Sequence, residues 1–128
     1  MSDAVRILVV DDEPIARSRL KTALEKHGYS VQTCSGGGEA LERLQTEQYR
    51  VVVTDIRMDD IDGLQVLDVL QKNHPSTPAV LITGYASVEL AREALAKGAF
   101  DIIAKPFQPR DLRAIIERAL REVRPAVG

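Results

Sequence analysis

The sequence contains no tryptophan and a single cysteine, and aromatic residues make up 4% of its 128 residues. One cysteine, Cys34, excludes an internal disulfide framework and argues against a zinc site built from cysteines. The few aromatic rings argue against a surface that stacks nucleic acid bases and against a flavin site. No apolar run approaches the roughly 20 residues of a membrane span. The first residues lack the basic-then-apolar order of a signal peptide, so we expect a reduced, cytoplasmic compartment.

The charges are nearly balanced, with 17 lysines and arginines against 19 aspartates and glutamates and a net charge of −2. This balance excludes a strongly basic nucleic-acid-binding protein, and we expect no direct contact with nucleic acid or with a membrane. The length is typical of one domain. The expected domain spans residues 1–128, with a core over about 5–123 and residues 124–128 as a tail or the start of a linker.

Short apolar, β-branched runs alternate with longer segments of helical periodicity. The apolar runs predict strands at 5–10, 29–33, 51–54, 79–83 and 101–104, and the periodic segments predict helices at 14–26, 39–47, 64–73, 88–97 and 109–123. Five strands alternating with five helices predict an α/β fold, in which a doubly wound parallel sheet carries helices on both faces. The pattern by itself does not determine the order of the strands.

Chemically capable side chains follow four of the five predicted strands. These residues are Asp11 and Asp12 after the first strand, Asp55 after the third, Thr83 at the end of the fourth and Lys105 after the fifth. Each residue taken alone also has a structural explanation. Asp11 or Asp12, for example, could cap the first helix. In a parallel sheet, however, these strand ends point to one edge, where ligands bind. We therefore expect the five side chains to share one crevice.

Three clustered carboxylates need a cation, because a pair about 4 Å apart repels by about 4 kcal/mol at an effective dielectric constant near 20. Lys105 offsets one charge, and a divalent ion would offset two more. Oxygen ligands favour Mg²⁺, Mn²⁺ or Ca²⁺ over zinc. A carboxylate nucleophile, a metal, a hydroxyl and an ammonium group are the parts of a phosphoryl-transfer site. Because no nucleotide-binding glycine loop is present, we expect a phosphorylated partner or small phosphodonor instead of bound ATP.

In these residues the chain resembles the receiver domain of two-component response regulators, over about residues 5–123. The resemblance rests on Val-Val-Asp-Asp-Glu-Pro at 9–14, Thr-Asp-Ile-Arg-Met at 54–58, Asp-Gly at 62–63, Leu-Ile-Thr-Gly-Tyr at 81–85, Lys-Gly-Ala at 97–99 and Lys-Pro-Phe at 105–107. It implies a flavodoxin-like (βα)5 fold with strand order 2-1-3-4-5.

The resemblance also implies a set of roles around Asp55, which would accept a phosphoryl group from the phosphohistidine of a sensor histidine kinase or phosphotransfer protein. Mg²⁺, with Mn²⁺ as the alternative ion, would be held by Asp11, Asp12, Asp55 and the backbone carbonyl of Arg57. Lys105 would pair with the phosphoryl oxygens, and its peptide bond to the following proline is expected to be cis. The domain would be a regulatory phosphoacceptor that assists its own phosphorylation and dephosphorylation, and no enzyme in its own right.

By the same resemblance, the Thr83 hydroxyl and the backbone of Ile56 and Gly84 would contact the phosphoryl group. Movement of Thr83 would change the face formed by the fourth helix, fifth strand and fifth helix, which would control an output domain or partner in transcription regulation. That face is also the expected surface of a homodimer.

Two positions depart from the family pattern. Ile102 stands where the family usually has an aromatic switch residue, and a β-branched side chain cannot sweep the same arc. We therefore expect a switch carried by backbone and helix shifts, or a partial substitution by Tyr85. Asp59 and Asp60 follow Met58 where proline is frequent, and we expect both to be solvated loop carboxylates.

Three other functions stay open from the residues. A phosphatase of the haloacid-dehalogenase type would need an aspartate two residues after the nucleophile, where Arg57 stands. A flavodoxin-like cofactor binder would need more aromatic residues than this chain has. A phosphorylation-independent interaction domain on the same fold would not need the acidic, threonine and lysine positions.

Overall fold

The computed structural model describes residues 4–85 and 87–124, and the remainder of the expected tail, residues 125–128, lies outside this part of the chain. Within the described residues, strands and helices alternate as the sequence predicts. In chain order they are β1 (Arg6–Val10), α1 (Pro14–Glu25), β2 (Ser30–Cys34), α2 (Gly37–Thr46), β3 (Val51–Asp55), α3 (Gly63–Asn73), β4 (Ala79–Thr83), α4 (Val88–Ala96), β5 (Asp101–Ala104) and α5 (Pro109–Glu122).

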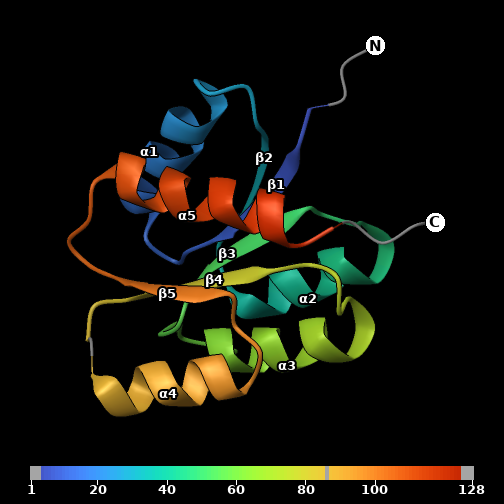
Figure 1. Cartoon of the computed structure of the whole chain (residues 1–128), viewed down its shortest axis with the longest axis vertical. Coiled ribbons are helices and arrows are strands. Elements are labelled where there is room, and N and C mark those ends of the chain that lie inside the picture. The colour runs from blue at the N-terminus through green and yellow to red at the C-terminus, as the bar shows by residue number, and fades with distance from the viewer. Residues whose placement is uncertain (1–3, 86, 125–128) are drawn as a thin grey trace.

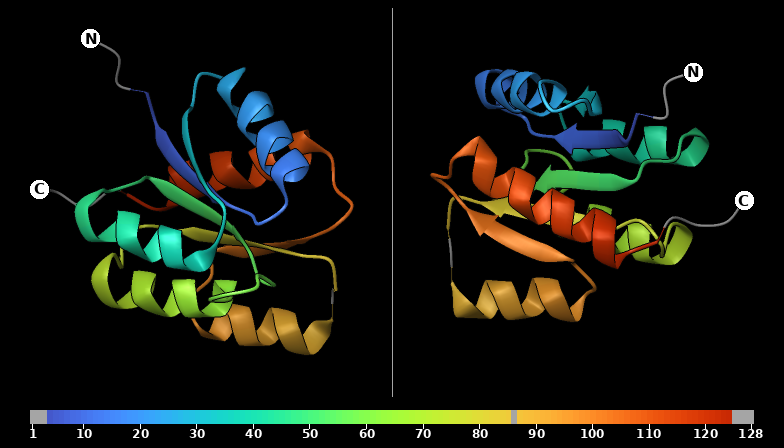
Figure 2. Two further views of the ribbon diagram at one scale, coloured as in Figure 1. Left: turned by 180° about the vertical axis from the view of Figure 1, so that it is seen from behind. Right: turned by 45° about the horizontal axis from the view of Figure 1, so that its top comes forward.

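The strands form one parallel sheet in the order β2-β1-β3-β4-β5, which confirms the predicted fold class and strand order. Helices α1 and α5 cover one face of the sheet, and α2, α3 and α4 cover the other (Figure 1, Figure 2). Successive strand residues point to opposite faces. Leu8 and Val52 therefore belong to the core cluster beneath α2 and α3, whereas Ile7 and Val53 belong to the cluster beneath α1 and α5.

The central strands β3 and β4 are buried along their whole length, and β1 is buried from its second residue onward. Their sequences are almost continuously apolar because helices cover both of their faces. The edge strand β5 is only partly buried. This burial holds the central strands rigidly, so the residues that follow them start from fixed positions.

Element boundaries differ from the prediction by one or two residues. Helix α2 begins at Gly37, two residues before the predicted start at Glu39. A Cβ atom on Gly37 would lie 2.2 Å from the Ile61 carbonyl oxygen, so the early turn of the helix depends on a close approach that only glycine allows. Helix α1 is followed by Gly28, whose φ of +88° lets the chain reverse into β2.

The carboxyl ends of the parallel strands meet at one edge of the sheet. The register pairs Val10 with Thr54, Asp55 with Ile82, and Thr83 with Ala104. The residues that follow β1, β3, β4 and β5 therefore emerge side by side, and this edge is where the predicted site residues lie.

Gly63, the first residue of α3, packs directly against the end of β3. A Cβ atom there would lie 2.4 Å from the Asp55 carbonyl oxygen and 2.9 Å from Ile56 Cα. Because both neighbours are backbone atoms, we expect Gly63→Ala to lower the free energy of unfolding in urea by about 2–3 kcal/mol. Gly84→Ala is the control, since its Cβ would meet nothing within 4 Å. Equal losses in the two variants would contradict this close packing.

Candidate functional site

Three carboxylates gather at the carboxyl edge of the sheet. Asp11 directly follows β1, Asp12 comes next, and Asp55 is the last residue of β3. One carboxylate oxygen of each lies within 4.8 Å of those of the other two. Asp11 is 0% exposed and Asp55 is 6% exposed, whereas Asp12 is open to solvent. The structure thus brings together the aspartates that the sequence singled out, with Asp12 on the solvent side of the cluster.

Lys105 reaches this cluster from the end of β5. Its Nζ atom donates a hydrogen bond to Asp55 Oδ2 at 3.0 Å and lies 3.9 Å from Asp11 Oδ2. Burial lowers the pKa of Lys105, but its hydrogen bond and ion pair with Asp55 outweigh burial and raise the pKa above its usual value. The ammonium group therefore stays charged at neutral pH. Its peptide bond to Pro106 is cis, as the resemblance implied.

Burial is the largest influence on the Asp55 carboxyl and raises its pKa. Lys105 acts in the opposite direction, and the neighbouring charges of Asp11 and Asp12 raise the pKa further. Asp55 is therefore a largely desolvated carboxyl group beside the Lys105 ammonium, which favours its ionised form against the effect of burial.

One Asp11 oxygen is in a hydrogen bond, whereas the other has, within the described part of the chain, only the ion pair with Lys105 at 3.9 Å. Its Oδ1 atom accepts a hydrogen bond from the Glu13 backbone N–H at 2.8 Å. Its buried Oδ2 atom makes no hydrogen bond to any described residue. Leaving such an atom unsatisfied is costly, and a small divalent cation would satisfy it. The all-oxygen donor set fits Mg²⁺, which favours one or two carboxylates and water.

The Thr83 hydroxyl is held by its own loop. It donates to the Tyr85 carbonyl oxygen at 3.1 Å and accepts from the Tyr85 backbone N–H at 3.0 Å. Thr83 is buried at the end of β4, and the following Gly84 has open space around it. The Thr83 hydroxyl is therefore coupled to the backbone of Tyr85 through both of these bonds.

Arg57 and Tyr85 connect the loops after β3 and β4. The Arg57 guanidinium lies 5.7 Å from the centre of the Tyr85 ring, which is 66% exposed. Ile102 lies in β5 and packs against the core cluster beneath α2 and α3. An aromatic ring therefore stands on the β4–α4 loop, at Tyr85, whereas the β5 position holds an isoleucine.

The β3–α3 loop makes two backbone contacts of note, and one of them corrects an expectation. The Ile56 N–H donates to the Ile82 carbonyl oxygen at 2.9 Å and extends the strand pairing, so a contact with a phosphoryl group would require this hydrogen bond to be exchanged. Asp60 is not a merely solvated carboxylate, since it accepts hydrogen bonds from the N–H groups of Gly37 at 3.2 Å and Gly38 at 2.9 Å. The run of three glycines at 36–38 was the sequence signal for this contact. Without side chains, the glycines leave the first N–H groups of the helix accessible to a neighbouring carboxylate.

A further contact at the edge was missed by the sequence reasoning. The Arg17 guanidinium donates to the Asp11 carbonyl oxygen at 2.8 Å and thereby holds the β1–α1 turn. A single arginine on a half-buried helix position carries no signal of this role in the sequence.

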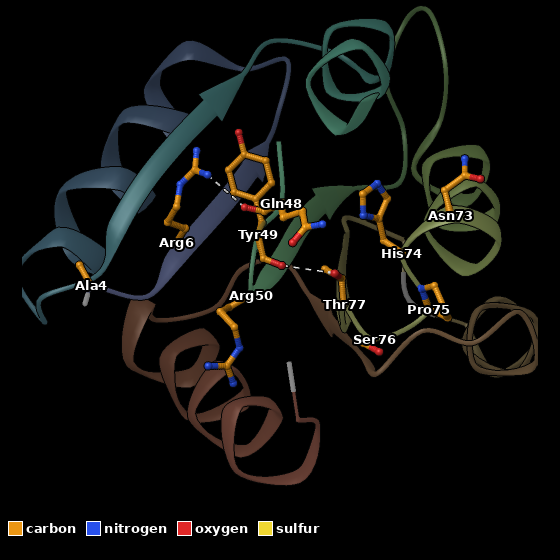
Figure 3. A pocket seen from close by; sticks show the side chains of 10 residues that line it. All are labelled: Ala4, Arg6, Gln48, Tyr49, Arg50, Asn73, His74, Pro75, Ser76 and Thr77. Carbon is orange, nitrogen blue, oxygen red and sulfur yellow. Dashed lines mark hydrogen bonds between the residues drawn. The ribbon is translucent and has the colours of Figure 1, made fainter. Parts of the chain in front are cut away.

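Two cavities lie at opposite edges of the sheet. One of about 600 Å³ opens beside the acidic cluster, and Asp11, Lys105 and Phe107 are among the residues that line it. The other, of about 350 Å³, lies at the amino ends of β1 and β3 (Figure 3). Its arginines are engaged, Arg6 with Glu47 and the Gln48 carbonyl oxygen and Arg50 with the Leu120 carbonyl oxygen. The carboxyl edge is therefore the better candidate for chemistry.

The profile of the family described as the response regulator receiver domain matches residues 7–117. The regulatory protein AtoC of Escherichia coli (strain K12) is 41% identical over 116 residues, which cover 91% of this chain and 25% of that protein. The nitrogen assimilation regulatory protein NtrX of Azorhizobium caulinodans is 38% identical over 120 residues, which cover 92% of this chain and 26% of that protein. The chain thus spans about a quarter of the length of these relatives.

Solved structures give the same result. A CheY-like receiver domain from Methanospirillum hungatei superposes with a TM-score of 0.89 at 35% identity, covering 94% of this chain and 96% of that one. The beryllofluoride-activated NtrC4 receiver domain dimer superposes with a TM-score of 0.87 at 36% identity, covering 91% and 97%. Among the described residues, no helix combines the length and apolarity that a bilayer crossing requires. Sequence profile, relatives and geometry agree, and the chain belongs to the family of response regulator receiver domains.

Proposed function

We propose that this receiver domain is a phosphorylation-controlled switch in which Asp55 accepts a phosphoryl group from the phosphohistidine of a sensor histidine kinase or phosphotransfer protein. The observation that carries the proposal is the Asp55 carboxylate itself. It is buried at the carboxyl edge, 3.0 Å from Lys105 Nζ, and shares that edge with two further carboxylates. As a receiver domain the chain is regulatory. In the proposed reaction it would supply the accepting carboxylate and the groups that assist phosphorylation and dephosphorylation.

In the proposed reaction, an Asp55 oxygen forms a bond to phosphorus while the bond between phosphorus and the donor nitrogen breaks. Lys105 would pair with the phosphoryl oxygens as charge on them increases. Asp11, Asp12, Asp55 and the backbone carbonyl of Arg57 would hold Mg²⁺ or Mn²⁺. When bound, the metal supplies positive charge that offsets the repulsion between the carboxylates and the incoming phosphoryl group.

The new charge on Asp55 would then attract the Thr83 hydroxyl away from Tyr85. Only a difference in contacts between the two states shifts their populations, and the exchange of hydrogen-bond partners at Thr83 provides one. Open space surrounds Gly84 on its Cβ side, since an added Cβ atom would meet nothing within 4 Å. Because Tyr85 stacks on Arg57, we propose that Tyr85 takes over part of the role that Ile102 cannot perform.

The output surface would be the α4–β5–α5 face. Tyr85 beside it and Val88 and Leu95 on α4 are large apolar side chains that are at least half exposed. Exposed apolar groups of this kind suit a protein interface. The NtrC4 receiver is described as a dimer in its activated form, and we propose that this face forms a homodimer or contacts an output domain.

The relatives are named as transcriptional and regulatory proteins, and this chain corresponds to about a quarter of them. We propose that the domain controls a transcription-regulating output in the cytoplasm through the switch described above, with no direct contact of its own to nucleic acid.

The phosphoacceptor assignment predicts a single modification. Incubation with Mg²⁺ and acetyl phosphate should add one phosphoryl mass to the wild-type protein, and intact-mass spectrometry measures it. Asp55→Asn should gain none, because an amide oxygen is a poor nucleophile. Asp59→Asn removes a charge from the same loop and should behave like the wild type. An unmodified wild-type protein with metal and donor in excess would refute the proposal.

The metal assignment predicts opposite effects of Asp12→Asn with and without Mg²⁺. In metal-free buffer the variant should melt at a higher temperature than wild type, because one of three mutually repelling charges is gone. Mg²⁺ at 100 times its dissociation constant should stabilise the wild-type protein by about 2.7 kcal/mol, and the same concentration should stabilise the variant far less. Thermal melts with Mg²⁺ and with a chelator measure both effects. Equal stabilisation of both proteins would exclude Asp12 from the metal site.

The switch assignment predicts that Thr83→Ala separates modification from response. The variant should still acquire the phosphoryl group at Asp55, but the amide chemical shifts of α4 and β5 should no longer change on phosphorylation. Thr83→Ser retains a hydroxyl and should restore most of the response. Wild-type-like shift changes in Thr83→Ala would show that the signal does not pass through this hydroxyl.

A further inference from the structure

The β3–α3 loop, residues 56–62, carries the chain away from the phosphoacceptor and is fastened at both ends. Near its start, the Ile56 carbonyl oxygen accepts a hydrogen bond from the Gly63 N–H at 2.8 Å. At its end, Asp62 and Gln65 form a reciprocal capping box at the start of α3, with bonds of 2.9 and 3.0 Å. Between these points, the loop must also hold the Arg57 carbonyl oxygen in position.

The middle of the loop is fastened by Asp60, whose carboxylate reaches across to another helix. Oδ1 accepts from the Gly37 N–H at 3.2 Å, and Oδ2 accepts from the Gly38 N–H at 2.9 Å. Both are first-turn N–H groups of α2 that have no partner within the helix. A carboxylate at a helix N-terminus is favoured by the helix dipole as well, and the Gly38 N–H is the largest of the influences that lower the Asp60 pKa.

The glycines opposite Asp60 match this contact closely. A Cβ atom on Gly38 would lie 2.9 Å from Asp60 Oδ2, and one on Gly36 would lie 3.0 Å from Asp60 Oδ1. A Cβ atom on Gly37 would meet the Ile61 backbone at 2.2 Å. The loop and the helix start therefore fit each other over three successive glycines. A side chain at Gly37 would meet the loop backbone, whereas one at Gly36 or Gly38 would displace the Asp60 carboxylate.

From this contact we infer that Asp60 is a positioning residue of the phosphoryl site, which sets the loop bearing the Arg57 carbonyl ligand by anchoring it to the start of α2. The inference rests on the proposed function, because it concerns metal and phosphoryl binding at Asp55. It goes further by assigning the loop geometry to a contact with α2, a helix that contributes no ligand. Loss of the anchor should weaken Mg²⁺ binding while leaving the reacting groups themselves intact.

Asp60→Asn is the first test, since it keeps the size of the side chain but offers one acceptor where two N–H groups need partners. Its dissociation constant for Mg²⁺, measured by isothermal titration calorimetry on the unphosphorylated protein, should rise about tenfold, the low end of what outer-shell partners of metal ligands contribute. The rate of phosphorylation by acetyl phosphate at saturating Mg²⁺ should stay close to that of wild type, because Asp55 and Lys105 are unchanged.

Gly38→Ala tests the same contact from the helix side. The added methyl group should displace the Asp60 carboxylate and weaken Mg²⁺ binding to a similar degree, although alanine favours the helix more than glycine does. The double variant with Asp60→Asn should be no weaker than the weaker single variant. A purely structural role would give a different pattern, in which Gly38→Ala leaves Mg²⁺ binding unchanged.

Two control variants separate charge and helix stability from positioning. Asp59→Asn removes the same charge from the same loop, and Asp59 makes no hydrogen bond or ion pair to the described residues. Glu39→Gln weakens the bond from the Ser35 N–H, at 2.9 Å, at the same helix start without touching the loop. In both variants the dissociation constant for Mg²⁺ should change by less than about twofold, because surface substitutions away from special contacts have small energetic effects.

Hydrogen exchange of the Gly37 and Gly38 amides, measured by NMR without metal, tests whether their hydrogen bonds to Asp60 are present. This measurement does not depend on phosphorylation activity. Faster exchange in Asp60→Asn together with weaker Mg²⁺ binding supports the inference. Faster exchange with Mg²⁺ binding equal to that of Asp59→Asn overturns it and leaves Asp60 as a helix cap, with the proposed function intact. A wild-type protein that binds no Mg²⁺ and gains no phosphoryl group overturns the proposed function, and this inference with it.

Discussion

The crowding of three carboxylates around one lysine is the constraint on which the rest of the edge depends. The parallel sheet brings Asp11 and Asp55 together with Asp12, within 4.8 Å of one another. Like charges at such distances repel by about 4 kcal/mol even at an effective dielectric constant of 20. Lys105 compensates Asp55 at 3.0 Å but lies 3.9 Å from Asp11. This excess of negative charge favours a bound cation, and a cation would relieve the repulsion that a negatively charged ligand meets at this edge.

Rigid and movable parts are divided between strands and loops. Asp55 stands at the end of a fully buried strand, so its position is set by the core. Thr83 is also buried, but among the described residues its hydroxyl is hydrogen-bonded to the backbone of the exposed Tyr85. In the proposed switch, this hydrogen bond on the neighbouring strand would change while the sheet stays intact. The β3–α3 loop belongs to the rigid part, because Asp60 and the Gly63 contact fasten it to two helices.

Most of the fold could be predicted because its signals are local. Apolar runs and helical periodicity are readable without tertiary contacts, and strand order followed from the resemblance. The predicted start of α2 was two residues late at Gly37, where the helix lies against the Ile61 backbone, a tertiary contact that local periodicity does not reveal. The gathering of Asp11, Asp55 and Lys105 was predictable for a different reason, since parallel strands must end at one edge.

The sequence by itself therefore determined the α/β class, the side chains that meet at the carboxyl edge and the family to which they belong. Only the tertiary structure decided how each of them is paired. It engages the Ile56 N–H in the sheet, turns the Thr83 hydroxyl toward Tyr85 and uses Asp60 to hold α2. The physical reason is that a hydrogen bond depends on angles and distances of a few tenths of an ångström. The Ile56 and Asp60 bonds join residues more than 20 positions apart, so no local pattern encodes them.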